Sequence, residues 1–472
     1  MTVSRRAFLR SAAATSTAFA GLPVLAGCGR GVDADYLSEV EGFGPLVADP
    51  RRLFDLPEDF SYAVFSEFGD LMDDGLLVPG DHDGMAAFPG PDGRVTLVRN
   101  HELYPDEADK SAFGANAERL ARVDETRIFD FTPEGEPHLG GTTTVDVDPE
   151  TLRVERQFLS LAGTCNNCAG GPTPWGSWIS CEETLMRAGE RARVDHGYAF
   201  EVAADATGLV DPVPLRGLGR FVHEAVAVDP ATGVVYQTED DDPGLIYRFL
   251  PDRPGELWRG GRLQALAIEG RPGADTRNWS GEDAIPVGER LSVRWIDLDE
   301  IHSPEGDLAA RGVAAGAARF TRGEGMWFGD GEVYFCCTDG GPERIGQIWR
   351  YRPSRFEGYA QESSEPGVLE LFVESTDPRL LENCDNITVA PWGDLIVVED
   401  GPAEQYIRGV TPEGRLYTIG RNAASEGGEY SEITGPCFSP DGSILFFNVQ
   451  RPGRTFAVRG PWARRSLQPR SA

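Results

Sequence analysis

Acidic side chains recur directly after short segments rich in β-branched and aromatic residues. Such segments are typical of β-strands, so these acids stand where strands end. The positions are Glu102, Cys181 with Glu182, Glu239 with Asp240, Asp339, and Glu399 with Asp400. A second set stands just before the first strand of a unit and comprises His223 with Glu224, Arg322 with Glu324, and Asp385 with Asn386.

Together the two sets predict a cation site, provided that folding brings them close to one another. Carboxylate and amide oxygens are the ligands that hard cations such as calcium prefer. The thiol of Cys181 indicates a softer and more strongly Lewis-acidic metal beside them. Carboxylates at close range raise one another's pKa unless cations neutralise them. The alternative is that each acid is a solvated loop residue, as is common in an acidic protein.

The elements that must position these residues form an internal repeat. Each unit has a short strand, a turn that contains Gly, and a second strand rich in β-branched and aromatic residues. Four units lie at 226–249, 326–351, 387–400 and 437–450, and 97–102 and 178–183 end in the same polar way. Six unevenly spaced units predict an all-β fold, a six-bladed β-propeller with long inter-blade loops. Equivalent positions then converge on one central channel.

Composition narrows the possible partners. The 472 residues include 76 Asp and Glu against 44 Lys and Arg, which gives a formal net charge of −32. Nucleic acid is therefore excluded as the main partner, because binding to phosphate backbones needs a concentrated basic face. Hydrophobic residues make up 40% of the chain, which is enough for a sizeable core. The 57 Gly and 34 Pro favour many tight turns over long helices.

Other residues that could do chemistry give weaker signals. Cys165 and Cys168 form a Cys-x-x-Cys pair, which could be half of a zinc knuckle or a redox pair, but no second pair completes a zinc site. Buried or disulfide-bonded positions are expected for Cys336, Cys337 and Cys384. His82 lies in an acidic turn, Asp81-His82-Asp83, for which we expect a structural role. The chain has no Gly-x-Ser-x-Gly motif and no phosphate-binding loop, so serine hydrolysis and nucleotide chemistry have no support.

The N-terminus predicts export. Arg5 and Arg6 precede a weakly hydrophobic, Ala-rich stretch, as in a twin-arginine signal. A lipobox at 25–28 ends it, with Cys28 as the residue that receives the lipid. We expect a signal over 1–27, a lead-in over 28–60 and one propeller domain over 61–465. The predicted location is the periplasm or cell envelope, with the membrane contacted only through a lipid on Cys28.

Several longer motifs resemble those of the PhoX-type alkaline phosphatases. They are Asn167-Cys-Ala-Gly-Gly-Pro-Thr-Pro-Trp-Gly-Ser-Trp-Ile-Ser-Cys181-Glu-Glu, Arg99-Asn-His-Glu102, Gly219-Arg-Phe-Val-His-Glu224, Arg322-Gly-Glu324, and the terminal Phe438-Ser-Pro-Asp-Gly, Asn448-Val-Gln-Arg-Pro-Gly and Gly460-Pro-Trp462. These motifs extend over most of the chain in the expected order. One departure is Pro172, since no lysine stands shortly before the Thr-Pro-Trp run.

The resemblance implies a six-bladed propeller, exported by the twin-arginine route, that hydrolyses phosphate monoesters. It implies two ferric ions (Fe3+) and several calcium ions (Ca2+) in the channel. Cys181 would ligate iron, with Glu224 or Glu239 and Glu324 as further cluster ligands, and Arg322 would hold the phosphate. The remaining candidate ligands are Asn100, Glu102, Glu182, Asp339, Asp385 and Asp400. Arg322 and Glu324 are the predicted catalytic residues.

Two other functions remain open on the sequence. One is a calcium-dependent propeller hydrolase of the lactonase kind, which needs neither a Cys ligand nor a phosphate-binding Arg. The other is a non-catalytic, calcium-binding lipoprotein scaffold. For the phosphatase hypothesis we expect small phosphorylated molecules as substrates and a monomeric protein.

Overall fold

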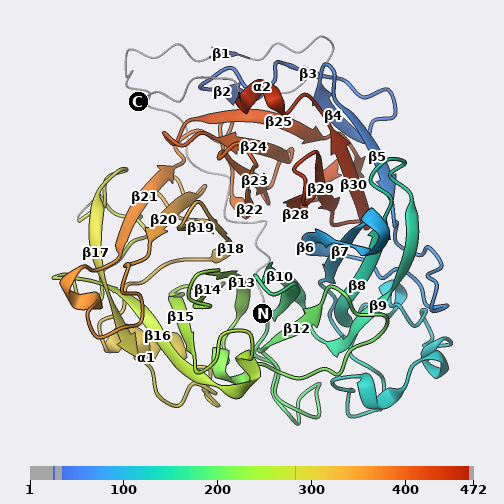
Figure 1. The fold of residues 1–472 in the computed structure, drawn as a ribbon, viewed down its shortest axis with the longest axis horizontal. Helices are drawn as coiled ribbons and strands as arrows, with labels where there is room; N and C mark the ends of the chain where they lie inside the picture. Colours follow the sequence, from blue (N-terminus) through green and yellow to red (C-terminus); the bar gives the residue numbers. More distant parts are fainter. Residues whose placement is uncertain (1–24, 27–34, 282, 467–472) are drawn as a thin grey trace.

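Short strands alternate with tight turns throughout the chain, because runs of Val, Ile, Phe and Tyr are separated by Gly-containing turns. In the computed structural model the described residues are 25–26, 35–281 and 283–466. Their antiparallel sheets surround one axis (Figure 1), and six inner strands contact one another in a ring around it. The predicted all-β propeller fold is therefore confirmed. The twin-arginine segment and Cys28 lie outside the described residues.

The strands of the first three blades follow one another along the chain. Blade 1 consists of β6 (His82–Pro89), β7 (Val95–His101), β8 (Gly140–Val147) and β9 (Val154–Thr164). Blade 2 consists of β10 (Asn167–Pro172), β11 (Ser177–Glu182) and β12 (Ala199–Ala203). Blade 3 consists of β13 (His223–Val228), β14 (Val235–Glu239), β15 (Ile246–Pro251), β16 (Gly261–Ile268) and β17 (Arg290–Asp297).

The last three blades close the ring. Blade 4 consists of β18 (Gly323–Gly329), β19 (Glu332–Cys337), β20 (Gln347–Arg352) and β21 (Val368–Glu374), and β21 also pairs with β17. Blade 5 consists of β22 (Cys384–Val389), β23 (Leu395–Glu399), β24 (Tyr406–Val410) and β25 (Leu416–Asn422), extended by β4 (Phe54–Pro57) and β3 (Leu46–Val47). Blade 6 consists of β28 (Ile433–Phe438), β29 (Ile444–Val449) and β30 (Arg454–Arg459), completed by β5 (Ser61–Phe65).

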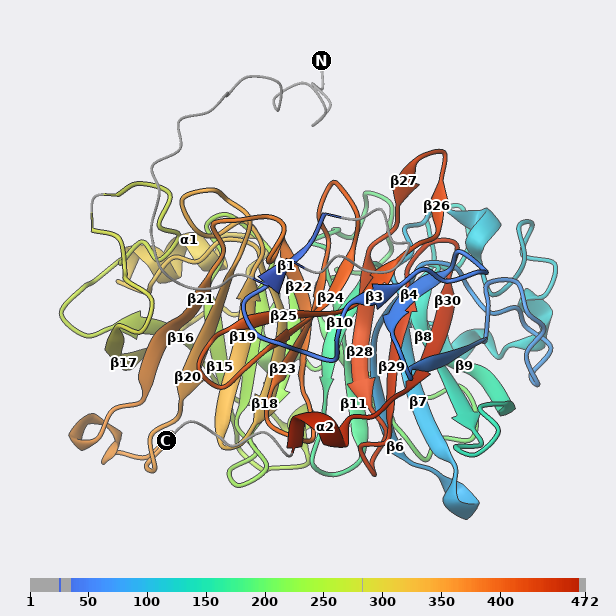
Figure 2. The same ribbon diagram turned by 90° about the horizontal axis from the view of Figure 1, so that it is seen from above.

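A few short elements lie outside the blades. Besides several 3-10 turns, they are β1 (Leu25–Ala26), β2 (Leu37–Ser38), β26 (Ser425–Glu426), β27 (Glu429–Tyr430), α1 (Leu308–Ala314) and α2 (Ala463–Ser466). The side view in Figure 2 shows the β26–β27 hairpin projecting from one end of the ring. Within the described residues, no helix is both long and apolar enough to cross a bilayer.

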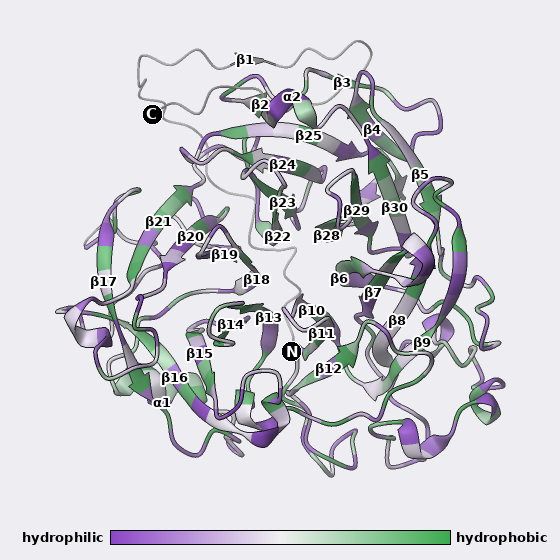
Figure 3. Ribbon diagram, viewed as in Figure 1, coloured by the Kyte–Doolittle hydropathy of each residue, from purple (hydrophilic) through white to green (hydrophobic). Residues whose placement is uncertain are grey.

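Hydrophobic clusters between neighbouring blades hold the ring together. Blades 3 and 4 share one that contains Tyr236 and Trp349, and blades 5 and 6 share one that contains Ile419 and Phe447. Equivalent clusters join the other neighbours, including the first and last blades. Figure 3 shows hydrophobic residues along the strands and hydrophilic residues in many outer loops. The core is thus divided among six interfaces that surround the axis.

The inner strands β6, β10, β13, β18, β22 and β28 each contact the next and form a closed ring. The strands approach so closely that small residues are required between them. A Cβ added at Gly325 lies 2.5 Å from Asn386 Cα, and one added at Gly84 lies 2.6 Å from Ala169 Cα. The first residues of these six strands therefore lie close together around the axis.

Candidate metal centre

A cavity of about 290 Å³ opens where the first residues of the inner strands meet. Among the described residues its lining includes nine carboxylates, one thiol, one amide, one phenol and one guanidinium. They are Asp83, Glu102, Glu183, Glu224, Asp240, Glu324, Asp385, Asp400, Glu432, Cys168, Asn386, Tyr104 and Arg322. The cavity is therefore strongly anionic, with Arg322 as the one cation that the described lining supplies.

The inner strands aim their side chains into this cavity through a shared irregularity. In each of the six, the register with the second strand shifts by an extra residue close to the strand's start. Such bulges redirect a side chain that regular pairing would send elsewhere. The residues placed in five of these shifts are Asp83, Cys168, Glu224, Glu324 and Asp385. Blade 6 has Gly435 instead, where a Cβ would lie 2.6 Å from the carbonyl oxygen of Asp83.

A second ring of acids follows the second strand of four blades. Glu102, Glu183, Asp240 and Asp400 are each the residue directly after β7, β11, β14 and β23. The residue just before each of them ends the strand and faces the other way, because side chains alternate along a strand. The cavity thus takes one acid from each of these ends, and the preceding residue belongs to the blade interior.

Glu182 and Glu239 illustrate that alternation and correct the predicted site. Glu182 is fully buried, and its carboxylate accepts hydrogen bonds from the backbone N–H groups of Cys165 (3.0 Å), Gly197 (2.9 Å) and Tyr198 (3.2 Å). The carboxylate of Glu239 accepts hydrogen bonds from Leu245 N (3.0 Å) and the Tyr247 hydroxyl (2.7 Å). Both acids hold loops inside their blades, and their successors line the cavity.

Cys181 is also placed away from the cavity. It is fully buried in the hydrophobic cluster between blades 2 and 3, beside Ile179 and Ala199. The thiol in the cavity belongs to Cys168, whose Sγ donates a hydrogen bond to Glu224 Oε2. The sequence signal for Cys168 was the Cys-x-x-Cys pair, which suggested a different kind of site. All seven cysteines in the part of the chain that is described are free and buried.

Two further predicted ligands lie beside the cavity without lining it. Asn100 donates to the carbonyl oxygens of Cys168 (3.0 Å) and Ala169 (2.7 Å) and accepts from Trp178 Nε1 (2.8 Å), so it fixes the backbone of β10. Asp339 accepts a hydrogen bond from Thr321 Oγ1 at 2.7 Å and comes two residues after β19. The predicted residues that do line the cavity are Glu102, Glu224, Arg322, Glu324, Asp385 and Asp400.

The guanidinium of Arg322 is held by two of the acids in the cavity. Nε lies 3.1 Å from Asp240 Oδ1, and Nη2 lies 2.6 Å from Glu324 Oε1. The backbone φ of Arg322 is +40°, an uncommon conformation for a residue with a side chain. On the other side, Gln450 Nε2 donates to Glu102 Oε2 at 2.6 Å. Ion pairs and amide contacts therefore orient the acids before any ligand binds.

The acids of the cavity cannot all carry their charge without cations. Burial, reinforced by neighbouring carboxylates, raises the pKa of Glu183, Glu224 and Glu324 well above its usual range. Burial and the nearby Asp81 carboxylate raise the pKa of Glu102 to about 7. A single guanidinium offsets one charge of nine, so the donor set fits multivalent cations.

Two groups of ligand atoms are spaced closely enough to share metal ions. One group is Cys168, Glu183 and Glu224, and the other is Glu224, Glu324 and Asp385. Within each group the ligand atoms lie within 4.8 Å of one another. Glu224 belongs to both groups, so it can bridge two neighbouring cations. Thiolate and carboxylates in the first group suit a Lewis-acidic transition metal, and the all-carboxylate second group suits a harder cation.

The chain resembles known proteins in its sequence and in its fold. The model of the family described as alkaline phosphatase PhoX matches residues 41–453. The PhoX of Pseudomonas fluorescens, solved with the transition-state analogue vanadate, superposes with a TM-score of 0.65 at 18% identity, covering 87% of this chain and 96% of that one. A gluconolactonase from Xanthomonas campestris gives a TM-score of 0.41 at 14% identity, covering 89% and 99%. No curated protein matches the sequence.

Proposed function

Since the chain belongs to the alkaline phosphatase PhoX family, we propose that it hydrolyses phosphate monoesters at a cluster of iron and calcium ions held in the channel cavity. The observation that carries this proposal is the pair of ligand groups that share Glu224, one of them with the thiol of Cys168. A lactonase-like calcium site requires no thiol and no guanidinium, and this cavity has both.

The donor set divides between the two kinds of ion. Iron is assigned to Cys168, Glu183 and Glu224, because a thiolate and carboxylates favour a Lewis-acidic metal. Calcium is assigned to the remaining acids, among them Asp385 and Asp400, because calcium takes six to eight oxygen ligands. When bound, such ions supply the positive charge that polarises phosphoryl oxygens and lowers the pKa of an attacking water.

Arg322 is assigned the role of binding the phosphoryl group. Asp240 and Glu324 engage its Nε and Nη2, so the guanidinium is preoriented at the wall of the cavity. A guanidinium held in this way gives a charge-assisted contact to a phosphoryl oxygen and offsets the equatorial charge of the transition state. Glu324 therefore has two roles, as a cation ligand and as the group that positions Arg322.

The test is hydrolysis of p-nitrophenyl phosphate by the full chain, produced with its own signal and purified without chelator. Turnover is expected, together with iron and calcium in the protein, and it should disappear after chelation and return when both metals are added. A lactone substrate is assayed in parallel. Lactone turnover with calcium alone, or no ester turnover in protein that holds iron and calcium, would overturn the proposal.

Export by the twin-arginine route to the periplasm or cell envelope, lipid attachment at Cys28 and a monomeric state complete the proposal. Export and lipid attachment rest on the sequence of residues 1–28. Fractionation of cells that carry the wild-type chain or an Arg5→Lys, Arg6→Lys variant tests the route, since the variant should accumulate in the cytoplasm. Unchanged export of that variant would refute it.

A further inference from the structure

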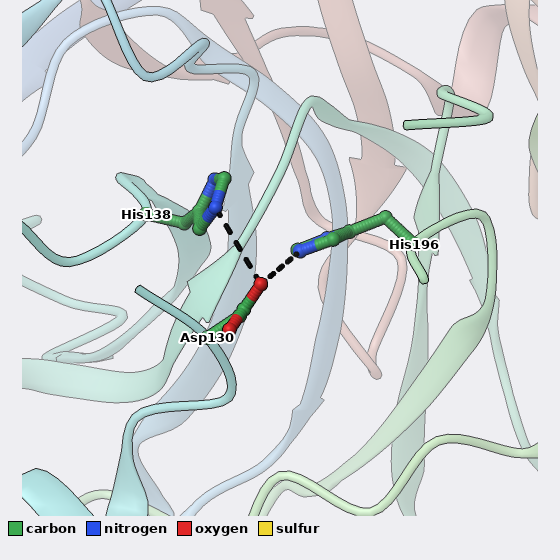
Figure 4. Close-up of side chains that lie close together, drawn as sticks. All are labelled: Asp130, His138 and His196. Atoms are coloured by element: carbon green, nitrogen blue, oxygen red, sulfur yellow. Dashed lines mark hydrogen bonds and ion pairs between the residues drawn. The ribbon is translucent and has the colours of Figure 1, made fainter. Parts of the chain in front are cut away.

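Asp130, His138 and His196 form a further cluster of side chains that could hold a metal ion, and none of them lines the channel cavity (Figure 4). Asp130 and His138 flank a tight turn between β7 and β8, in which the N–H of His138 donates to the carbonyl oxygen of Asp130 at 3.1 Å. His196 comes from the connection between β11 and β12. Three side chains from two separate connections therefore converge on one point.

Hydrogen bonding does not explain why His138 is part of the cluster. It is fully buried, and neither of its ring nitrogens has a hydrogen-bond partner among the described residues. Its Nε2 instead faces Asp130 Oδ2 at 3.7 Å. Leaving a buried imidazole nitrogen without a partner costs about 1–3 kcal/mol. A metal ion bound to this nitrogen would accept its lone pair.

Two of the distances between the three ligand atoms are close to those of a tetrahedral zinc site. Zinc–nitrogen bonds of roughly 2.0–2.1 Å place the ligands of a tetrahedron about 3.3 Å apart. Asp130 Oδ2 lies 3.2 Å from His196 Nε2 and 3.7 Å from His138 Nε2. Small shifts of the side chains would bring both imidazoles to bonding distance from one ion.

Glu182 supplies the outer support that such a site needs. Its Oε1 lies 2.6 Å from His196 Nδ1, so the carboxylate can accept a hydrogen bond from an N–H on that nitrogen, which directs Nε2 towards Asp130. Ligating histidines commonly donate their second N–H to a carboxylate in this way. The backbone N–H groups of Gly197 and Tyr198 fix Glu182 in turn.

We propose that Asp130, His138 and His196 bind a divalent transition-metal ion of the zinc class at a structural site. Two imidazoles and one carboxylate favour zinc over calcium, which takes oxygen ligands. The ion would join the β7–β8 connection to the β11–β12 connection, which begins at Glu183 in the channel.

The test compares zinc binding by the full chain and by two variants, at a zinc concentration where iron and calcium remain in the channel. His138→Gln should bind one zinc fewer per chain than the wild type and lose the rise in thermal midpoint that zinc gives. His302→Gln, which changes an exposed histidine, should bind as much zinc as the wild type. Equal binding by wild type and His138→Gln overturns the proposal.

A second measurement covers the case in which His138→Gln fails to fold. Crystals of the wild-type protein grown with zinc are examined by anomalous diffraction at the zinc edge. A peak among Asp130, His138 and His196 is the expected result. Zinc confined to the channel, or absent from both places, identifies the cluster as a hydrogen-bonded network without metal and overturns the proposal.

Discussion

Two consecutive acids, Glu182 and Glu183, should respond in opposite ways to the same chemical change. Replacing either by Gln removes one negative charge and keeps the size of the side chain. Glu182 ends β11 inside its blade, whereas Glu183 lines the channel. We therefore expect Glu182→Gln to lower stability and Glu183→Gln to lower metal binding.

The magnitudes follow from the contacts of each carboxylate. Glu182 Oε1 accepts from Cys165 N and the His196 ring, and Oε2 accepts from Gly197 N and Tyr198 N. In Gln an NH2 group replaces one carboxylate oxygen, so a donor stands where two hydrogen bonds were accepted. Two buried N–H groups left unmatched cost about 2–5 kcal/mol.

In protein without metal, the charge of Glu183 does not stabilise the fold as that of Glu182 does. Burial and the neighbouring Glu102 and Asp240 carboxylates raise its pKa, so its charge is unfavourable there. Its carboxylate accepts a side-chain hydrogen bond from Asn166 Nδ2 at 3.0 Å, and a Gln oxygen can accept it too. Glu183→Gln should therefore change the free energy of unfolding by less than about 1 kcal/mol. It should weaken metal binding and ester turnover by about tenfold or more.

The assay is thermal unfolding in chelator, followed by metal content and hydrolysis of p-nitrophenyl phosphate for the wild type and both variants. A lower thermal midpoint is expected for Glu182→Gln alone, and a large loss of iron for Glu183→Gln. Destabilisation of Glu183→Gln instead of Glu182→Gln, or retention of iron and turnover by Glu183→Gln, would place Glu183 outside the metal site.

Four further predictions follow from the cavity and the inner ring. Cys168→Ser should contain less iron than the wild type when metal content is measured by mass spectrometry. Cys181→Ser should keep its iron but be less stable by about 1–3 kcal/mol, because it buries a hydroxyl among apolar groups. Loss of iron from Cys181→Ser alone would reverse the assignment of the iron ligand. Arg322→Met should lower kcat/KM for p-nitrophenyl phosphate by about 10–100-fold, the worth of a charge-assisted contact, and an unchanged value would remove Arg322 from phosphate binding. Gly325→Val places a Cβ 2.5 Å from a backbone atom of β22 and should lower the thermal midpoint, which a wild-type midpoint would disprove. In metal-free protein, folding raises the pKa of Glu102 from its ordinary 4.5 to about 7. Between these pH values the folded state binds more protons than the unfolded state, so the free energy of unfolding should rise as the pH falls from about 7 towards 4.5. A free energy of unfolding that falls over this range would contradict the prediction.

The repeat was predictable because each unit carries its own local sequence pattern. Strand, Gly-containing turn and strand recur at 226–249, 326–351, 387–400 and 437–450, and each corresponds to inner and second strands of a blade. The closure of blade 6 was not predictable in this way. β5 pairs with β30, which is far away in the sequence, and no local pattern specifies that pairing.

The site was predictable in kind but not residue by residue. A strand alternates with period two, so an error of one residue moves a side chain from the channel to the blade interior. That error separates Glu182 from Glu183 and Glu239 from Asp240. The bulges that aim Cys168 into the cavity depend on pairing with β11, which a sequence does not display. For the same reason the histidine cluster has no motif, because its ligands come from two distant connections.

Binding of iron by Cys168 and Glu224 in the channel cavity underlies the proposed chemistry. It is tested by anomalous diffraction at the iron edge, on crystals of protein exported by its own signal and purified without chelator. An iron peak within bonding distance of Cys168 Sγ and a carboxylate oxygen of Glu224 is the expected result. A channel that holds calcium but no iron, or an iron peak at Cys181, would contradict it.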